Sequence, residues 1–302
     1  MANQIFTYGS AKALTANTFK REGYTFQGWA TSTGGAVKYK DKQSVSNLTS
    51  TNGATVNLYA VWQGISYSVK FNANGGTGSM ANQSFTYGTA KALTANAFKR
   101  TNYTFQGWAT SAGGAVKYKD KQSVSNLTTT NGATVTLYAV WKINTFTVKF
   151  NANGGTGTMA DQSFNFGSAK ALTANAFKRT GYTFQGWSTS PGGPVKYKDK
   201  QSVSNLTSTN GGTVTLYAVW KANTYTVKFN ANGGTGIMLN QSFTYDKAKA
   251  LTGNAFFRIG YTFQGWATSS GGAVKYKDKQ SVSNLTSTNG ATVTLYAVWK
   301  KK

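Results

Sequence analysis

A repeat of 79 residues constrains this chain more than any other feature of its sequence. The eight tryptophans form two series with that step, and the four methionines keep it as well. The series are Trp29, Trp108, Trp187 and Trp266, then Trp62, Trp141, Trp220 and Trp299, then Met1, Met80, Met159 and Met238. Because a fixed period indicates tandem small units rather than one large core, the 302 residues are interpreted as four modules. We assign them to residues 1–64, 65–143, 144–222 and 223–302.

The second copy illustrates the elements expected in each module. Tyr67, Val69 and Phe71 alternate with polar residues, which predicts a half-buried strand. Residues 134–142, "TVTLYAVWK", predict the clearest strand, and residues 90–100 lose the alternation and predict one or two turns of helix. The residues therefore predict an α+β class that is mostly β. Because almost no linker separates the copies, we expect a semi-rigid rod.

The segment "VKFNANGGTG" raises the question of a phosphate-binding loop. It begins at Val69, Val148 and Val227, and it contains neither the third glycine of a dinucleotide fingerprint nor the Gly-Lys-Ser/Thr of a P-loop. We interpret it as a turn that ends the first strand of a module. Since it occurs three times for four modules, residues 1–64 are expected to lack that strand.

A second turn is predicted immediately before each "YTFQGW" block. The residue at this position is Gly23, Asn102, Gly181 or Gly260. Glycine and asparagine tolerate the left-handed region of backbone conformation best, so their interchange predicts a positive φ angle.

Net charge and side-chain chemistry limit the functions that this chain can have. The chain has 32 Lys and Arg against 7 Asp and Glu, no histidine and no cysteine. This excess favours polyanionic partners, while the residue types supply no thiol, no imidazole and no acidic cluster for catalysis or metal binding. We therefore expect neither enzymatic activity nor a cofactor. Asp120 and its equivalents are the only recurring acids, and the only candidates for the buried acid that a Lys–Asn crosslink requires. No apolar run is long enough to predict a membrane span.

The segment "VKYKDKQSVSNLT" is identical in all four copies and carries the candidate binding residues. Read as a strand, it places three lysines on one face, with Tyr118 and Asp120 on the other. One interpretation is a lysine row that binds an anionic polymer through many weak contacts; the other is an edge strand whose lysines prevent aggregation. The candidate residues are Lys38, Lys40, Lys42, Lys117, Lys119, Lys121, Lys196, Lys198, Lys200, Lys275, Lys277 and Lys279. The 28 lysines against 4 arginines argue against nucleic acid as the partner.

Three blocks resemble a known family. "RTGYTFQGW" from Arg179, "YTVKFNANGG" from Tyr225 and "TLYAVWK" from Thr294 are similar to the internalin B-type repeat, also called the Listeria-Bacteroides repeat. The resemblance implies a small β-grasp-like module, with a bent sheet and one short helix, carried in tandem on extracellular bacterial surface proteins. It also implies a stalk or adhesion role without catalysis. This chain departs from the family by carrying Asn72 and Gln106, with their equivalents, where aspartate is frequent.

Together these observations predict a non-enzymatic stalk or spacer of a bacterial surface protein. Its basic faces are expected to contact anionic cell-wall or host polysaccharides. The alternatives are a dedicated polyanion- or glycosaminoglycan-binding adhesin and a self-associating extracellular fibre.

Overall fold

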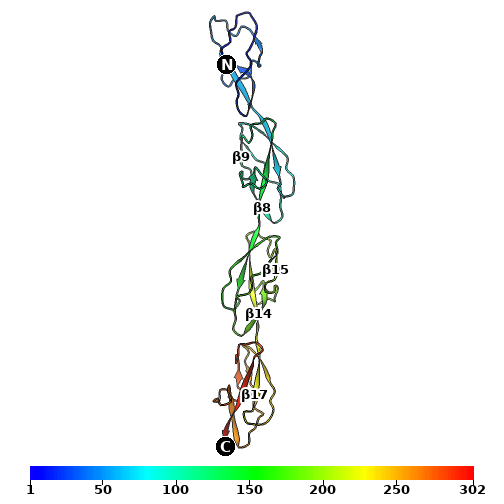
Figure 1. The fold of residues 1–302 in the computed structure, drawn as a ribbon, viewed down its shortest axis with the longest axis vertical. Helices are drawn as coiled ribbons and strands as arrows, with labels where there is room; N and C mark the ends of the chain where they lie inside the picture. The colour runs from blue at the N-terminus through cyan, green and yellow to red at the C-terminus, as the bar shows by residue number, and fades with distance from the viewer. The chain divides into compact units, whose positions relative to one another are not determined.

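The computed structural model describes residues 1–302 as strands joined by turns (Figure 1). It divides into two compact units, Met1–Ile143 and Asn144–Lys302, each of which holds two repeats. No helix is present in either unit. The predicted α+β class with one short helix per module is therefore wrong, and the β-grasp-like module that includes this helix is wrong with it.

A complete repeat builds a four-stranded sheet and a small two-stranded one. In the second repeat the larger sheet has the order β6-β5-β10-β8, in which β5 and β10 run parallel and the outer pairs run antiparallel. The smaller sheet pairs β7 with β9. The bounds are β5 (Ser66–Asn72), β6 (Gln83–Thr86), β7 (Lys91–Ala92), β8 (Tyr103–Ala109), β9 (Ser123–Val124) and β10 (Thr134–Ile143).

The third and fourth repeats have the same topology, and the first has a reduced one. The third contains β11 (Thr145–Asn151), β12 (Gln162–Asn165), β13 (Lys170–Ala171), β14 (Tyr182–Ser188), β15 (Ser202–Val203) and β16 (Thr213–Ala222). The fourth contains β17 (Thr224–Asn230), β18 (Gln241–Thr244), β19 (Lys249–Ala250), β20 (Tyr261–Ala267), β21 (Ser281–Val282) and β22 (Thr292–Lys301). The first contains only β1 (Lys12–Ala13), β2 (Tyr24–Ala30), β3 (Ser44–Val45) and β4 (Tyr59–Gly64). It forms two separate pairs, β1-β3 and β2-β4.

The segment predicted to be helical contains only the two-residue strand β7 and an isolated bridge at Lys99, because its backbone groups bond elsewhere. Leu93 donates its N–H to the carbonyl of Gln122 at 2.9 Å, and Thr94 donates its N–H to the side-chain oxygen of Gln83 at 2.8 Å. The Asn96 side chain accepts the N–H of Phe98 and donates to its carbonyl. A side chain that bonds nearby backbone groups in this way competes directly with helix formation.

The core of each complete repeat surrounds one tryptophan. Trp108 is fully buried, and its ring lies 4.8 Å from that of Phe71 and 4.9 Å from that of Phe105, centroid to centroid. Its indole N–H has no hydrogen-bond partner, so this residue stabilises the fold through apolar and aromatic contact. Phe71 comes from β5 and Phe105 from β8, so the tryptophan joins the two halves of the sheet.

The glycine-rich segment is a turn, as predicted. Gly76 donates its N–H to the carbonyl of Ala73 at 2.9 Å, and Asn74 adopts a φ of 47°. The indole N–H of Trp141 bonds the same Ala73 carbonyl at 2.8 Å, and Asn74 donates to the carbonyl of Ala139. These two hydrogen bonds attach the turn to β10, so the Ala73 carbonyl and the Asn74 side chain hold the turn in place.

Within each unit, consecutive repeats are joined by a single residue between two strands. Ile65 separates β4 from β5; it donates its N–H to Gly23 of the first repeat, and its carbonyl accepts the N–H of Tyr87 of the second. The Tyr24 and Tyr87 rings meet edge to face, 5.4 Å apart. Asn223 makes the same two backbone bonds between the third and fourth repeats, to Gly181 and from Tyr245.

The predicted positive φ angles before the "YTFQGW" blocks are confirmed. They are 74° at Gly23, 65° at Asn102, 75° at Gly181 and 76° at Gly260. At Asn102 the left-handed conformation belongs to the tight turn in which Tyr103 donates to the carbonyl of Arg100. Only glycine and short polar residues adopt it at low cost.

We expect Asn102→Val to destabilise the protein by about 1–3 kcal/mol, because a β-branched side chain is strained at a positive φ. Asn102→Gly is the control, and it should change the free energy of unfolding by less than about 1 kcal/mol. Urea unfolding of both variants measures the difference. Equal stability of the valine and glycine variants would contradict the role of this turn.

Candidate functional site: the lysine turns

The candidate lysines lie on a turn and not on a strand. We call residues 117–121, and their equivalents 38–42, 196–200 and 275–279, the lysine turns. Tyr118 forms an isolated bridge with Trp108, after which Gln122 donates to the carbonyl of Lys119 at 3.2 Å. Lys121 has a φ of 57°. The predicted strand with a lysine row on one face is therefore wrong, and so is the edge-strand interpretation.

The position of the lysine turn depends on Gly107 in β8. The register between β8 and β10 shifts at this point, and Gly107 has a φ of 142°. A Cβ atom at Gly107 would lie 2.6 Å from both the carbonyl oxygen of Tyr118 and Cγ1 of Val116. The bulge and the absent side chain thus let the backbone before the lysine turn approach the strand.

Asp120 fastens the lysine turn to the segment once expected to be helical. Its Oδ1 accepts the N–H of Asn96 at 2.9 Å, and Asp41, Asp199 and Asp278 accept the equivalent N–H in the other repeats. Asp120 is exposed, so it does not provide the buried acid that a Lys–Asn crosslink requires. Its role in the structure is to hold a loop.

All twelve candidate lysines are exposed. In the second repeat the Lys117 ammonium lies 5.6 Å from the centroid of the Tyr118 ring, which leaves its charge available to solvent. Three lysines against one aspartate give each lysine turn a positive field that salt screens over about 10 Å. The geometry suits weak contacts with an extended anionic chain, repeated once per module.

Four other lysines serve the fold, a role that the sequence pattern did not reveal. Lys91 donates its ammonium to the carbonyl of Ser84 at 3.0 Å and lies 5.6 Å from the Phe85 ring centroid. Lys12, Lys170 and Lys249 make the equivalent hydrogen bonds. The lysines are therefore of at least two kinds, those that tie strand segments together and those that project from turns.

A tyrosine–aspartate pair is found only at the contact between the third and fourth repeats. The Tyr182 hydroxyl donates to Oδ2 of Asp246 at 2.9 Å, and Asn284 donates to Oδ1 at 2.8 Å. The hydrogen bond from Asn284, followed by that from Tyr182, holds the pKa of Asp246 below its ordinary value. The same Asp246 carboxylate raises the pKa of Tyr182. Equivalent positions carry Gly9, Gly88 and Gly167, so the pair is specific to this contact.

We expect the Asp246–Tyr182 interaction to weaken as the pH falls below about 4. Because the folded-state pKa is lowered, the ionised form stabilises the contact above the ordinary aspartate pKa, and protonation removes this stabilisation at lower pH. Titrating the Asp246 carboxyl carbon by NMR measures the midpoint. Tyr182→Phe should move that midpoint upward, toward the ordinary value; an unchanged midpoint would contradict the contribution of the tyrosine.

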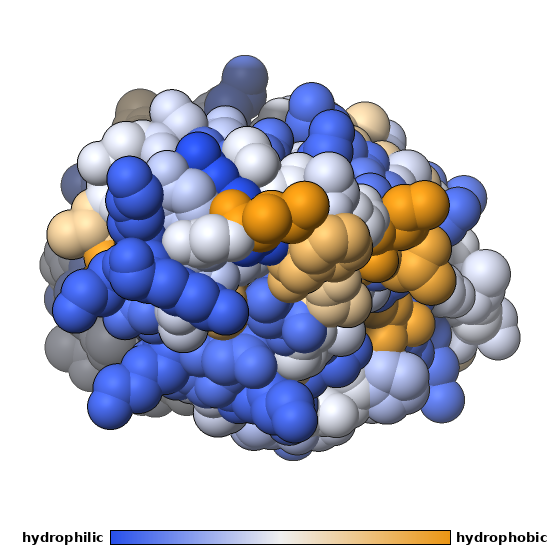
Figure 2. Space-filling view, turned by 90° about the horizontal axis from the view of Figure 1, so that it is seen from below, coloured by the Kyte–Doolittle hydropathy of each residue, from blue (hydrophilic) through white to orange (hydrophobic).

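The fourth repeat also carries an apolar surface patch that the 79-residue repeat does not predict. Ile237, Leu239, Phe257 and Ile259 have exposed fractions of 85%, 82%, 61% and 89%. The bridge between Thr235 and Phe257 brings their two segments side by side. Figure 2 shows orange side chains gathered next to blue ones on this end of the molecule. The signal was available in the sequence, since the third repeat has Thr158, Ala160, Lys178 and Thr180 at these positions.

Replacing the patch by the residues of the third repeat provides a matched variant, I237T/L239A/F257K/I259T. We expect weaker binding of a hydrophobic dye, because exposed apolar surface is removed. The free energy of unfolding should change by no more than about 0.5 kcal/mol per site, because exposed side chains contribute little to stability. Dye fluorescence and urea unfolding measure the two effects; unchanged dye binding would contradict the patch as the principal exposed apolar surface.

The comparisons with known proteins agree with the repeat. The model of the Listeria-Bacteroides repeat domain matches residues 1–61, 67–140, 146–219 and 225–298. The chain belongs to this family. A putative Gly-rich membrane protein of Evansella cellulosilytica is 28% identical over 293 residues, covering 94% of this chain and 30% of the relative. A putative membrane protein of the same organism is 27% identical over 292 residues, covering 93% of this chain and 39% of the relative. The chain thus spans about a third of the length of these relatives.

The family assignment confirms the predicted resemblance and the four copies. The structure contains no long apolar helix of the kind that crosses a bilayer.

Proposed function

We propose that this chain is a non-enzymatic structural spacer of a bacterial surface protein, which supports adhesion by projecting another part of that protein. The observation that carries the proposal is the joint between repeats. Ile65 and Asn223 each bond one repeat through the N–H and the next through the carbonyl. A joint of one residue with backbone bonds on both sides restricts hinge motion, which suits a spacer.

Side chains at the joints add to this restriction. Gly23 lies so close to the Tyr87 ring that a Cβ atom would collide with it, and Gly88 lies equally close to the Tyr24 hydroxyl. The Arg21 guanidinium covers the Tyr24 ring at 3.9 Å from its centroid. Family membership and the description of the Evansella relatives as membrane proteins support a location at the bacterial cell surface, outside the cell.

A distance measurement between two repeats tests the spacer. The chain has no cysteine, so Thr51→Cys and Thr130→Cys place two spin labels on exposed turns of the first and second repeats. We expect a narrow distance distribution, because the Ile65 joint fixes the two repeats. The control inserts six Gly and Ser residues between Gly64 and Ile65, which should broaden the distribution at least about twofold. A parent distribution as broad as that of the control would overturn the proposal.

A second candidate function is binding of an anionic polysaccharide, favoured by the exposure of all twelve lysines on the lysine turns. Its test compares two variants with the same net charge. The first changes these twelve lysines to Gln. The second changes twelve other exposed lysines that are not in the set bonded to strand carbonyls: Lys20, Lys70, Lys99, Lys142, Lys149, Lys178, Lys221, Lys228, Lys247, Lys300, Lys301 and Lys302.

We expect the first variant to elute from heparin at clearly lower salt than the second, because the lysine turns present their charges as one cluster of three in every repeat. Equal elution would show that net charge alone governs retention, and it would remove the lysine turns as a specific binding surface. Circular dichroism of both variants verifies that the sheets remain folded.

A further inference from the structure

The apolar patch of the fourth repeat belongs to two segments that lie side by side. Thr235 of one segment bridges Phe257 of the other. The side chains alternate along both segments: Met238 and Phe256 pack on the core of the repeat, and the four residues of the apolar patch, on either side of them in sequence, are exposed. The patch therefore cannot be withdrawn into the core, because the inward positions are already taken by its neighbours.

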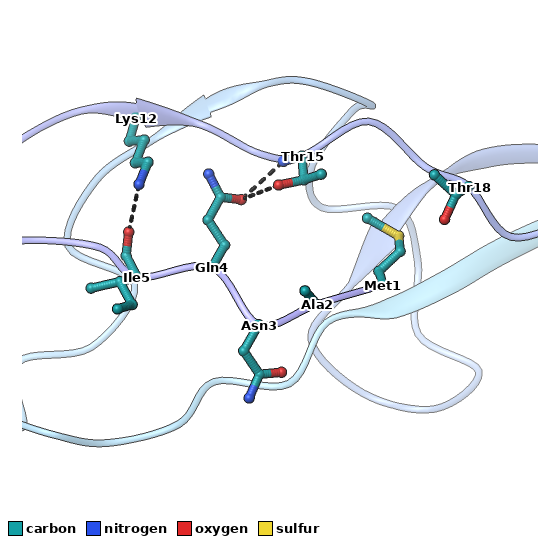
Figure 3. Close-up of a pocket in the computed structure, with 8 residues that line it drawn as sticks. All are labelled: Met1, Ala2, Asn3, Gln4, Ile5, Lys12, Thr15 and Thr18. Atoms are coloured by element: carbon teal, nitrogen blue, oxygen red, sulfur yellow. Dashed lines mark hydrogen bonds between the residues drawn. The ribbon is translucent and has the colours of Figure 1, made fainter.

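The backbone beneath the apolar patch is held by the same bonds as in the other repeats. Gln241 follows the first of the two segments, and its side chain donates to the carbonyl of Ala250 at 2.8 Å and accepts the N–H of Thr252 at 2.9 Å. Figure 3 shows the equivalent side chain of the first repeat, Gln4, bonded to Thr15. The fourth repeat thus differs in the side chains that it presents and not in the scaffold that presents them.

A neighbouring repeat does not cover these positions. The third repeat is joined directly to the fourth within one compact unit. Its four equivalent side chains nevertheless remain exposed; they are Thr158, Ala160, Lys178 and Thr180. The positions of the apolar patch therefore lie on the outer surface of a repeat even when another repeat follows it.

Basic side chains adjoin the apolar patch. Arg258 stands between Phe257 and Ile259, and its guanidinium lies 4.0 Å from the centroid of the Tyr261 ring. Lys301 is paired with Tyr261 across the sheet and is exposed. Hydrophilic side chains are visible directly beside the apolar ones at this end of the molecule (Figure 2).

The fourth repeat as a whole is strongly basic. Residues 223–302 contain nine lysines and one arginine against two aspartates. Both aspartates are engaged in the fold: Asp246 bonds Tyr182 and Asn284, and Asp278 accepts the N–H of Asn254. The surface that carries the apolar patch is therefore complementary in charge to an anionic partner.

A second copy of the chain suits this surface poorly. Four exposed side chains offer on the order of 300 Å² of apolar area, against the roughly 800 Å² that each partner buries in a standard protein interface. Two such patches would also bring like charges together. A bilayer surface has neither requirement, because it accepts apolar side chains without a complementary shape, and its anionic headgroups attract the cations beside them.

We propose that the apolar patch inserts into the surface of a bilayer that contains anionic lipids. Arg258 and Lys301 lie at the level of the headgroup phosphates. The side chains that enter the boundary between headgroups and acyl chains are Ile237, Leu239, Phe257 and Ile259. Because each contribution is small by itself, binding requires the apolar side chains and the anionic lipid together.

The test sediments the full chain with vesicles of phosphatidylcholine that contain about 30 mol% phosphatidylglycerol. The matched variant I237T/L239A/F257K/I259T gains one positive charge, so attraction by lysines alone would leave its binding equal or stronger. We expect the variant to bind at least about tenfold more weakly than the parent, and the parent to bind vesicles of phosphatidylcholine alone at least about tenfold more weakly. Undiminished binding in either comparison would overturn the proposal.

Transferring the patch gives a variant whose effect does not depend on the folding of the fourth repeat. Adding T158I/A160L/K178F/T180I to the matched variant places the same four side chains on the third repeat and restores the net charge of the parent. We expect binding to the anionic vesicles to strengthen again by at least about fivefold. No gain over the matched variant would contradict insertion by these side chains.

A fluorescent label locates the inserted surface. The chain has no cysteine, so Ile237→Cys and Thr288→Cys each accept one environment-sensitive dye, at the patch and at an exposed turn of the same repeat. We expect the emission to shift to shorter wavelength on addition of the anionic vesicles for the label at position 237 alone. No shift there, or an equal shift at both positions, would place the membrane contact elsewhere and overturn the proposal.

Sedimentation velocity without vesicles examines the competing occupant. We expect the parent to show no dimerisation that depends on the apolar patch. A concentration-dependent dimer that the matched variant abolishes would assign the patch to a second copy of the chain and overturn the proposal.

Discussion

The parallel pairing of the first strand with the last is the interaction on which each complete repeat depends. β5 lies in the middle of the sheet, bonded to β6 on one side and to β10 on the other. Its buried face delivers Phe71 to Trp108, and the turn after it receives the indole N–H of Trp141. The first repeat shows the consequence of its absence, because its buried core contracts to Leu14, Trp29 and Val45. Of the four-stranded sheet only the pair β2-β4 remains, the counterpart of β8-β10.

In this fold, side chains form the hydrogen bonds with backbone groups that a helix would otherwise supply. Gln83, Asn96 and Asp120 each satisfy backbone groups of a segment that has few ladder partners. Such bonds let a module of about 79 residues order long irregular stretches without disulfides or metals. They also explain how the recurring aspartate can be both exposed and structural, since the Asp120 carboxylate accepts the N–H of Asn96.

The positive charge is distributed according to two different structural roles. Lys91 and its equivalents donate to strand carbonyls, and the lysine turns project into solvent. The repeats differ from one another at other residues. The third and fourth repeats are joined by the Tyr182–Asp246 pair, and the fourth repeat carries the apolar patch.

The sequence by itself determined the features that depend on short-range backbone geometry or on the spacing of residue types along the chain. The period, the alternation of Tyr67, Val69 and Phe71, the turn after Asn72 and the positive φ at Asn102 all follow from short-range preferences. Only the tertiary structure decided whether residues 90–100 form a helix and whether the lysines share a strand face. In both places the backbone groups find partners outside the segment itself, such as Gln122 for Leu93 and Trp108 for Tyr118.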